Sequence, residues 1–329
     1  MTPAGELLAA EIERQGPIPF RRFMEVALYH PQCGYYRQGR DPFGRGGDFY
    51  TAEQVQPVFG MLIAARVRQL WRDLGQPADF TVVELGAGRG EMAPAFSDWH
   101  YLPVEIGSGD LPRGFEGVIF SNEFFDALPV DVAVYTKSEY RQQLVTFDSG
   151  RFVWTLGDVV TEESGDYLRR YVPPPEEGWW SEVHLEALGW IERMARALQS
   201  GWVLTIDYGY TLPEVIRFPR GTLMSYRQHT ALDDVLDEPG VRDITAHVNF
   251  TALERHGSAY GLHAERFETL AQTLLAAGEE EMTRALAGAG AAEELRRRLQ
   301  LKTLLFGMGE TFRVLWQRKE GKEFGGKSP

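Results

Sequence analysis

The sequence predicts an α/β fold in which helices flank a mostly parallel sheet. Three short apolar runs support this prediction, because each has the length of a buried strand and leads into glycines or carboxylates. They are residues 81–85, 117–122 and 201–206. A helix is predicted over 184–199, with one apolar face formed by Leu185, Leu188, Ile191, Met194 and Leu198.

Three glycines follow the first run at alternate positions, Gly86, Gly88 and Gly90, and we expect residues 91–97 to start a helix. Glycine tolerates positive φ and lets the backbone approach a ligand closely. The free N–H groups of a helix start favour an anionic group. The pattern therefore indicates a site for a small charged ligand.

The spacing of this loop indicates which ligand it holds. A dinucleotide fingerprint needs a third glycine at position 91, where the chain has Glu91. The run Glu84-x-Gly86-x-Gly88-x-Gly90 instead resembles the first motif of class I S-adenosylmethionine-dependent methyltransferases, although a glycine-rich turn of another α/β domain stays an alternative. The resemblance implies that the cofactor is held by Glu84, Gly86, Ala87, Gly88 and Gly90.

The composition of the chain argues against several classes of protein. The single cysteine, Cys33, excludes an internal disulfide and fits a reducing compartment. No apolar run approaches the roughly 20 residues of a membrane span, and the first residues lack a secretory signal pattern, so we expect a cytoplasmic protein without membrane insertion. The formal net charge of −13 argues against nucleic-acid binding and would attract a basic, arginine-bearing partner.

The order of elements suggests a helical cap and a larger domain. Helices are expected at 4–14, at 20–29 and from Thr51, as N-cap, to residue 74, which makes residues 1–75 an N-terminal helical cap. Residues 76–329 form the methyltransferase domain, with insertions at about 131–175 and 269–308. The first insertion contains a hairpin that turns at Asp148-Ser-Gly. Helical sequence is expected from 250 to about 304, interrupted at 288–290, before a last strand at 310–317.

A narrower resemblance comes from several motifs. They are Phe23-Met24-Glu25, Tyr29-His30-Pro31, Gly34-Tyr35-Tyr36, Gly47-Asp48-Phe49-x-Thr51 and residues 121–130. Together they resemble the MidA family, which contains the mitochondrial methyltransferase that assembles respiratory complex I by modifying an arginine. The resemblance implies methylation of a protein arginine, with a respiratory-complex subunit as one acceptor and a homodimer as one oligomeric state. Asp48 and Thr51 are expected either to face the cofactor or only to cap a helix.

Only about 26 residues separate Gly90 from the strand at 117, too few for the two strands and two helices of a full doubly wound unit, so we expect one edge strand to be missing. We expect residues 100–105 to form the second strand, ending at Glu105. This acid stands 21 positions after Glu84 and would accept both ribose hydroxyls. If 100–105 is instead the third strand, the ribose acid is absent.

The acceptor side is expected at the end of the strand 117–122. Asn122, Glu123 and Asp126 could clasp a guanidinium and orient one nitrogen towards the methyl group; the alternative is that Glu123 and Asp126 cap a helix start. Further acceptor-side residues from the matching motifs are Asp207, Tyr208, Tyr226 and His247. The family resemblance leads us to expect Asp at 249, where the chain has Asn249.

No metal is expected, because His229, Asp243 and His247 lack a tight ligand spacing. The resulting hypothesis is an S-adenosylmethionine-dependent methyltransferase that acts on a protein arginine. Two alternatives stay open, a methyltransferase of small molecules and a non-catalytic assembly protein that keeps a degenerate cofactor fold.

Overall fold

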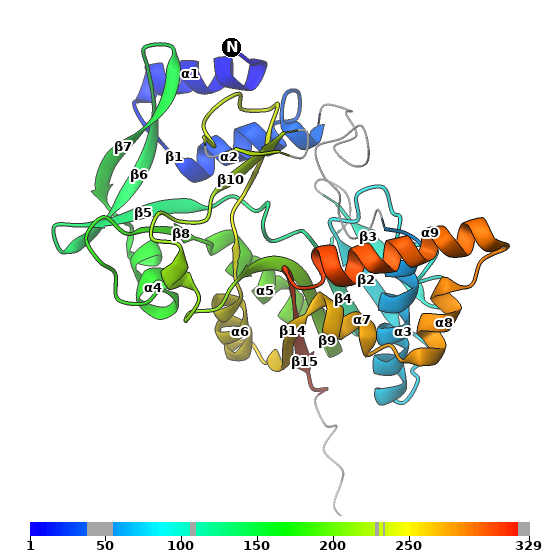
Figure 1. Cartoon of the computed structure of the whole chain (residues 1–329). Coiled ribbons are helices and arrows are strands. Elements are labelled where there is room, and N and C mark those ends of the chain that lie inside the picture. Colours follow the sequence, from blue (N-terminus) through cyan, green and yellow to red (C-terminus); the bar gives the residue numbers. More distant parts are fainter. Residues whose placement is uncertain (38–54, 106–109, 228–229, 233, 322–329) are drawn as a thin grey trace, which may run out of the picture. The chain divides into compact units, whose positions relative to one another are not determined.

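The structure is a computed structural model that describes residues 1–37, 55–105, 110–227, 230–232 and 234–321 (Figure 1). The chain divides into two compact units, each assembled from three segments. Unit 1 contains residues 1–50, 125–188 and 210–252, and unit 2 contains residues 51–124, 189–209 and 253–329. The expected boundary between residues 75 and 76 coincides with no edge of these units.

A single sheet forms the centre of unit 2. Its strands lie in the order β14-β15-β9-β4-β2-β3. Neighbouring strands from β9 to β3 are parallel, and β15 is antiparallel to both β9 and β14. The bounds are β2 Thr81–Leu85, β3 His100–Val104, β4 Phe115–Asn122, β9 Leu198–Tyr210, β14 His263–Thr269 and β15 Phe312–Lys319. The predicted mostly parallel α/β sheet is confirmed.

The segment 100–105 is the second strand rather than the third, because β3 pairs directly with β2. In the described part of the chain, no strand follows β3 on its outer side. Residues 106–109 lie outside that part, so the missing edge strand stays a prediction.

Helices pack on one face of this sheet around a large apolar core. Val82, Phe120 and Trp202 of the sheet contact side chains of the helices in this core. The helices are α3 Val58–Asp73, α7 Leu270–Leu275, α8 Glu279–Leu286, α9 Ala291–Lys302 and a π-helical segment, Thr303–Met308. α5 Leu185–Ala197 and α6 Phe250–Ala259 each begin in unit 1 and end in unit 2.

Two predicted helices differ from the structure. The helix expected from Thr51 begins at Val58, after Pro57 at its N-cap, because proline has no N–H and disfavours helical backbone in the residue before it. The region 250–304 is not helical throughout, because β14 occupies 263–269. Most residues of β14 are exposed. Its sequence therefore does not show the alternation of apolar and polar residues that predicts a half-buried strand.

A separate sheet organises unit 1. Its strand order is β1-β6-β5-β8, and β7 pairs with β6. The bounds are β1 Ile18–Pro19, β5 Asp131–Thr136, β6 Glu139–Asp148, β7 Arg151–Val159 and β8 Trp180–Val183. A smaller sheet contains β10 Met224–Arg227, β11 Thr230–Leu232 and β12 Asp243–Thr245. The short strand β13, Val248–Asn249, belongs to neither of these two sheets. The predicted hairpin at Asp148 is confirmed as β6 and β7.

The first helices of the chain pack onto this hairpin. They are α1 Pro3–Gln15 and α2 Phe20–Tyr29, as predicted, and α4 Glu162–Tyr171 belongs to the same unit. Phe20 of α2 lies 4.9 Å from Trp154 and Phe23 lies 5.4 Å from Phe152, measured between ring centroids. Part of the expected N-terminal cap, residues 1–75, therefore packs in the same core as the expected insertion at 131–175.

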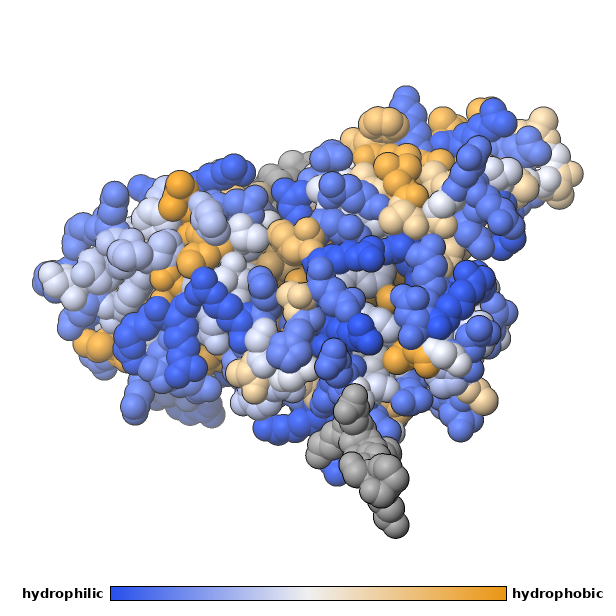
Figure 2. Space-filling model, turned by 90° about the horizontal axis from the view of Figure 1, so that it is seen from below, coloured by the Kyte–Doolittle hydropathy of each residue, from blue (hydrophilic) through white to orange (hydrophobic). Residues whose placement is uncertain are grey.

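The longest helix of the described residues is α3, with 16 residues that include Arg66, Arg68 and Arg72. None of the described helices combines the length and the apolar character needed to cross a bilayer. Figure 2 shows one face of the molecule, where hydrophilic residues in blue surround small groups of apolar residues in orange.

Candidate active site

The carboxyl edge of the parallel strands in unit 2 gathers most of the predicted site. Leu85 of β2 pairs with Val104 of β3 and with Ser121 of β4, so these strands end at the same level. The chain runs from β2 to β3 on one side and then to β4 on the other side of β2. Such a change of direction marks the crevice where open α/β sheets bind ligands.

The glycine loop lies at this edge, directly after β2. Gly86, Gly88 and Gly90 have φ values of 68°, 52° and 69°, a region that other residues seldom adopt. A methyl group added to Gly86 would lie 3.1 Å from the ring of Phe124, whereas one added to Gly90 would meet no atom within 4 Å. The loop is therefore closed by Phe124 at one end and open at the other.

Two carboxylates lie beside this loop, and each accepts a hydrogen bond. The Glu84 side chain is fully buried in β2 and accepts a hydrogen bond from the hydroxyl of Tyr101. Glu105, just after β3, accepts a hydrogen bond from the N–H of Gly88. The acid predicted for the ribose is thus in contact with the predicted glycine loop.

The segment after the loop corrects one expectation, because residues 91–98 form successive turns and no helix. Hydrogen bonds join Ala93 N–H to Gly90 and Ala95 N–H to Met92. Only nine residues, 91–99, return the chain from Gly90 to the start of β3. Turns of the 3₁₀ type rise about 2 Å per residue against about 1.5 Å for an α-helix, so they cover this distance with fewer residues. The predicted helix N-terminus is therefore absent at this point.

The end of β4 presents an acid with unusual backbone geometry. Glu123 has a φ of 51°, and its N–H donates to the carbonyl of Ile206 in β9 at 3.0 Å. The amide nitrogen of Asn122 donates to Glu123 Oε1 at 3.2 Å. No helix begins between 123 and 130, so the alternative that Glu123 and Asp126 cap a helix is wrong. Positive φ in a residue other than glycine is costly and is found preferentially at functional sites.

The other acceptor-side residues divide between the units. Asp207 of unit 2 is fully buried, and its Oδ1 accepts the N–H of Tyr208 at 2.9 Å. Asp126 of unit 1 is 4% exposed, and its backbone carbonyl accepts the N–H of Ala246. The acceptor-side residues assigned to unit 2 are Asn122, Glu123, Asp207 and Tyr208; those of unit 1 are Asp126, Tyr226 and His247.

His247 and Tyr226 lie in different segments of unit 1. The N–H of His247 donates to Thr222 Oγ1 at 3.0 Å, and burial lowers the pKa of its imidazole to about 4. Tyr226 stands on β10 opposite Asp243 of β12. His247 is therefore neutral at physiological pH.

Asp48 and Thr51 lie outside the described residues, and so does His229. Within the described ranges, no group of three His, Cys, Asp or Glu side chains is arranged to hold a metal ion.

Sequence reasoning missed Tyr101 and Phe124. Glu84 pairs with Pro103, so Tyr101, two positions earlier on β3, faces the same side of the sheet. This relation depends on strand register, which the sequence alone does not specify here. Phe124 adjoins the predicted Glu123, but an aromatic residue beside an acid carries no distinctive signal.

A parallel sheet with an antiparallel last pair, and a glycine loop at the change of strand direction, defines this protein as a class I S-adenosylmethionine-dependent methyltransferase. The comparisons agree. Residues 96–268 match the family model described as "Putative S-adenosyl-L-methionine-dependent methyltransferase", and the chain belongs to this MidA-like family.

Solved and curated relatives support the same assignment. A Burkholderia thailandensis protein crystallised with S-adenosyl-homocysteine has a TM-score of 0.85 and 30% identity, covering 96% of this chain and 92% of that chain. The mitochondrial protein arginine methyltransferase NDUFAF7 homolog of Drosophila melanogaster is 30% identical, over 76% of this chain and 68% of the relative. Human NDUFAF7 is 27% identical, over 78% of this chain and 69% of the relative. S-adenosylmethionine is the cofactor, and the glycine loop with its Phe124 wall and open end fits it.

Proposed function

We propose that this methyltransferase acts on an arginine side chain of a protein. The observation that carries the proposal is Glu123, an acid held at positive φ directly after β4, the strand beside the one that feeds the glycine loop. A carboxylate can bind a guanidinium through two parallel hydrogen bonds. The two curated relatives described above are named protein arginine methyltransferases.

In this proposal each residue of the acceptor side has a defined task. S-adenosylmethionine would supply a methyl group on a positively charged sulfur; as the bond from that methyl group to nitrogen forms, its bond to sulfur would break and neutral S-adenosyl-homocysteine would leave. Glu123 and Asn122 hold the guanidinium and turn one nitrogen towards that methyl group, and Glu123 accepts the proton that the nitrogen loses. The sequence prediction adds Asp126 to the acceptor-side residues. The remaining acceptor-side residues are proposed to be Asp207, Tyr208, Tyr226 and His247.

The cofactor contacts are also proposed residue by residue. The backbone of Gly86, Ala87, Gly88 and Gly90 holds the methionine end, where the three glycines have no side chain and leave room. Glu84 supplies negative charge near the cationic groups of the cofactor. Glu105 accepts the ribose hydroxyls. Asp48 and Thr51 complete the proposed set.

The partner and the location are part of the proposal. A net charge of −13 favours a basic acceptor protein, and a respiratory-complex subunit and a homodimer remain predictions from the family resemblance. We propose a cytoplasmic location because the single cysteine fits a reducing compartment. The two curated relatives are named as mitochondrial, so fractionation of cells that express this protein provides the test.

The decisive experiment combines methyl transfer with cofactor binding. Purified protein is incubated with methyl-labelled S-adenosylmethionine and arginine-bearing proteins, including respiratory-complex subunits, and the products are analysed for methylarginine by mass spectrometry. Glu123→Gln should abolish labelling while calorimetric affinity for S-adenosyl-homocysteine stays at the parent value. Glu116→Gln is the matched control, because Glu116 lies near the opposite end of β4.

The other possible outcomes of this experiment favour different functions. Label on a residue other than arginine, or only on small molecules, contradicts the proposed acceptor. Cofactor binding without transfer to any acceptor favours the non-catalytic assembly protein. Equal labelling by the parent and Glu123→Gln removes Glu123 from the acceptor site.

A further inference from the structure

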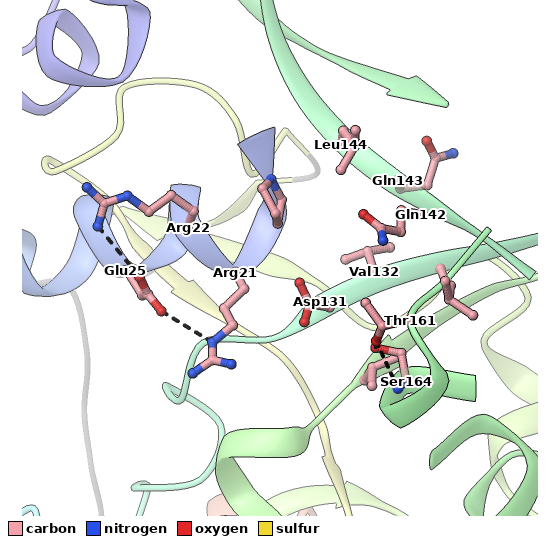
Figure 3. A pocket seen from close by; sticks show the side chains of 14 residues that line it. Arg21, Arg22, Glu25, Asp131, Val132, Gln142, Gln143, Leu144, Thr161 and Ser164 are labelled. Atoms are coloured by element: carbon pink, nitrogen blue, oxygen red, sulfur yellow. Dashed lines mark hydrogen bonds and ion pairs between the residues drawn. The ribbon is translucent and has the colours of Figure 1, made fainter. Parts of the chain in front are cut away.

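Unit 1 contains a pocket of about 380 Å³ where two strands share one side of β6 (Figure 3). β5 pairs with β6 as far as Gln142, opposite Ala133, and β1 takes over at Leu144, opposite Pro19. Gln143 lies between the two partners, and the pocket opens at this fork. Its volume is at the lower end of the roughly 300–1,000 Å³ of ligand pockets, which suits one large side chain better than a cofactor.

Asp131, the first residue of β5, lines this pocket with an uncompensated charge. Its side chain is half-buried, and no described residue forms a hydrogen bond or ion pair with its carboxylate. Burial raises the pKa of Asp131, and the opposing field of Arg21 has a smaller effect. A carboxylate that has lost part of its hydration without gaining a partner is ready to accept a cation.

The two arginines of the pocket are already neutralised. Arg21 contacts Glu25 at 3.2 Å and Glu186 at 3.1 Å. Arg22 contacts Glu11 at 3.1 Å and Glu25 at 3.6 Å. Three carboxylates therefore surround two guanidinium groups, so an anionic ligand would have to displace existing ion pairs. The pocket favours a cation.

The remaining lining fits a long cationic side chain. Gln142 lies opposite Ala133 and so shares a strand face with Asp131. Its side chain forms no hydrogen bond with any described residue, so its amide oxygen can accept one. Thr161 caps α4 by accepting the N–H of Ser164 at 3.2 Å. Apolar walls that can cover methylene groups come from Pro19, Val132, Leu144, Val160 and Val183.

We propose that this pocket binds an arginine side chain of a basic protein ligand, with Asp131 accepting its guanidinium. The planar guanidinium has five N–H donors, which match the Asp131 carboxylate and the Gln142 amide oxygen better than the compact ammonium of lysine does. The pocket belongs to unit 1 and the glycine loop to unit 2. This inference goes beyond methyl transfer and does not depend on which side chain receives the methyl group.

The test measures binding of N-acetyl-L-arginine amide to the full-length protein by NMR titration, followed on the signals of residues that line the pocket so that binding at the proposed Glu123 site is not counted. The parent should bind in the millimolar range, and Asp131→Asn should weaken binding at least tenfold. The matched control is Asp158→Asn, which removes an exposed acid of β7 and should leave binding unchanged. N-acetyl-citrulline amide, which has a similar shape without the charge, should bind at least tenfold more weakly than the arginine probe.

Urea unfolding separates a binding role from a structural one. Because Asp131 holds an unfavourable charge, Asp131→Asn should fold and should unfold at the same or a higher urea concentration than the parent. Equal affinity of the parent and Asp131→Asn for the arginine probe would overturn the proposal. So would equal binding of the citrulline or a lysine analogue, or no saturable binding to the parent. Methyl transfer to an arginine would be unaffected by these outcomes, which distinguishes this inference from the proposed function.

Discussion

The glycine loop allows a test in which two substitutions share one backbone strain and differ in one contact. Gly86→Ala and Gly90→Ala both place a side chain at a φ near 70°, which costs roughly 1–2 kcal/mol. At Gly86 the new methyl group also lies 3.1 Å from Phe124, whose ring packs edge-on against Trp190 at 5.0 Å. Overpacking of this kind costs about 1–3 kcal/mol more. Gly86→Ala should therefore destabilise the protein by about 2–5 kcal/mol and Gly90→Ala by only about 1–2 kcal/mol.

Urea unfolding gives the two free energies, and calorimetry gives the affinity for S-adenosyl-homocysteine. The methyl group of Gly90→Ala enters the open end of the loop, so this variant should lose affinity about tenfold, or about 1.4 kcal/mol, despite its smaller loss of stability. Equal destabilisation by both substitutions would refute the role of Phe124 as a wall of the loop. Unchanged affinity in Gly90→Ala would show that the cofactor does not occupy the open end.

Three further predictions follow from polar groups. Asn249→Asp should cost about 1–3 kcal/mol in urea unfolding, because the buried amide donates to the carbonyl of Tyr171 at 3.0 Å and a carboxylate cannot; unchanged stability would contradict this. Burial lowers the pKa values of His184 and His247 to about 4 from 6.5. Between these pH values the unfolded chain binds protons that the folded protein does not, so the free energy of unfolding is highest above pH 6.5 and falls as the pH decreases towards 4. The loss for His184 is about 3 kcal/mol, and unfolding free energies that stay constant between pH 7 and 4.5 would refute it. Glu105→Gln should weaken S-adenosyl-homocysteine binding about tenfold by calorimetry, and full affinity would remove Glu105 from the ribose.

The sequence predicted the elements whose residues carry a strong local pattern. The strands around Val83, Ile119 and Leu204 are buried on both faces, so their continuous apolar runs marked them clearly. The glycine spacing identified the loop. Glu123 was predicted as a site residue because an acid directly follows a buried strand, and this role stays a prediction. The Asp148 turn likewise identified its hairpin.

Features that depend on distance between segments were missed. The turns at 91–98 follow from the short connection to β3, which only the sheet makes evident. β14 is a largely exposed edge strand, and its ladder to β15 rather than its side chains defines it. The contact of Glu84 with Tyr101 depends on the register of two strands. The position of Asp131 beside a pocket depends on β1 and β5 sharing one side of β6, a long-range pairing that no local sequence pattern indicates.

The interleaving of the two units has a consequence for synthesis on the ribosome. Thr2, the N-cap of α1, donates its hydroxyl hydrogen bond to the carbonyl of Pro239, and unit 1 is complete only when residue 252 is available. At about 5–20 residues per second, the first helix waits roughly 10–50 s for this partner. During that time Leu8 and Ile12 of α1 lack contact with the part of their core that contains Val235 and Leu236, and transiently exposed apolar surface of this kind promotes aggregation.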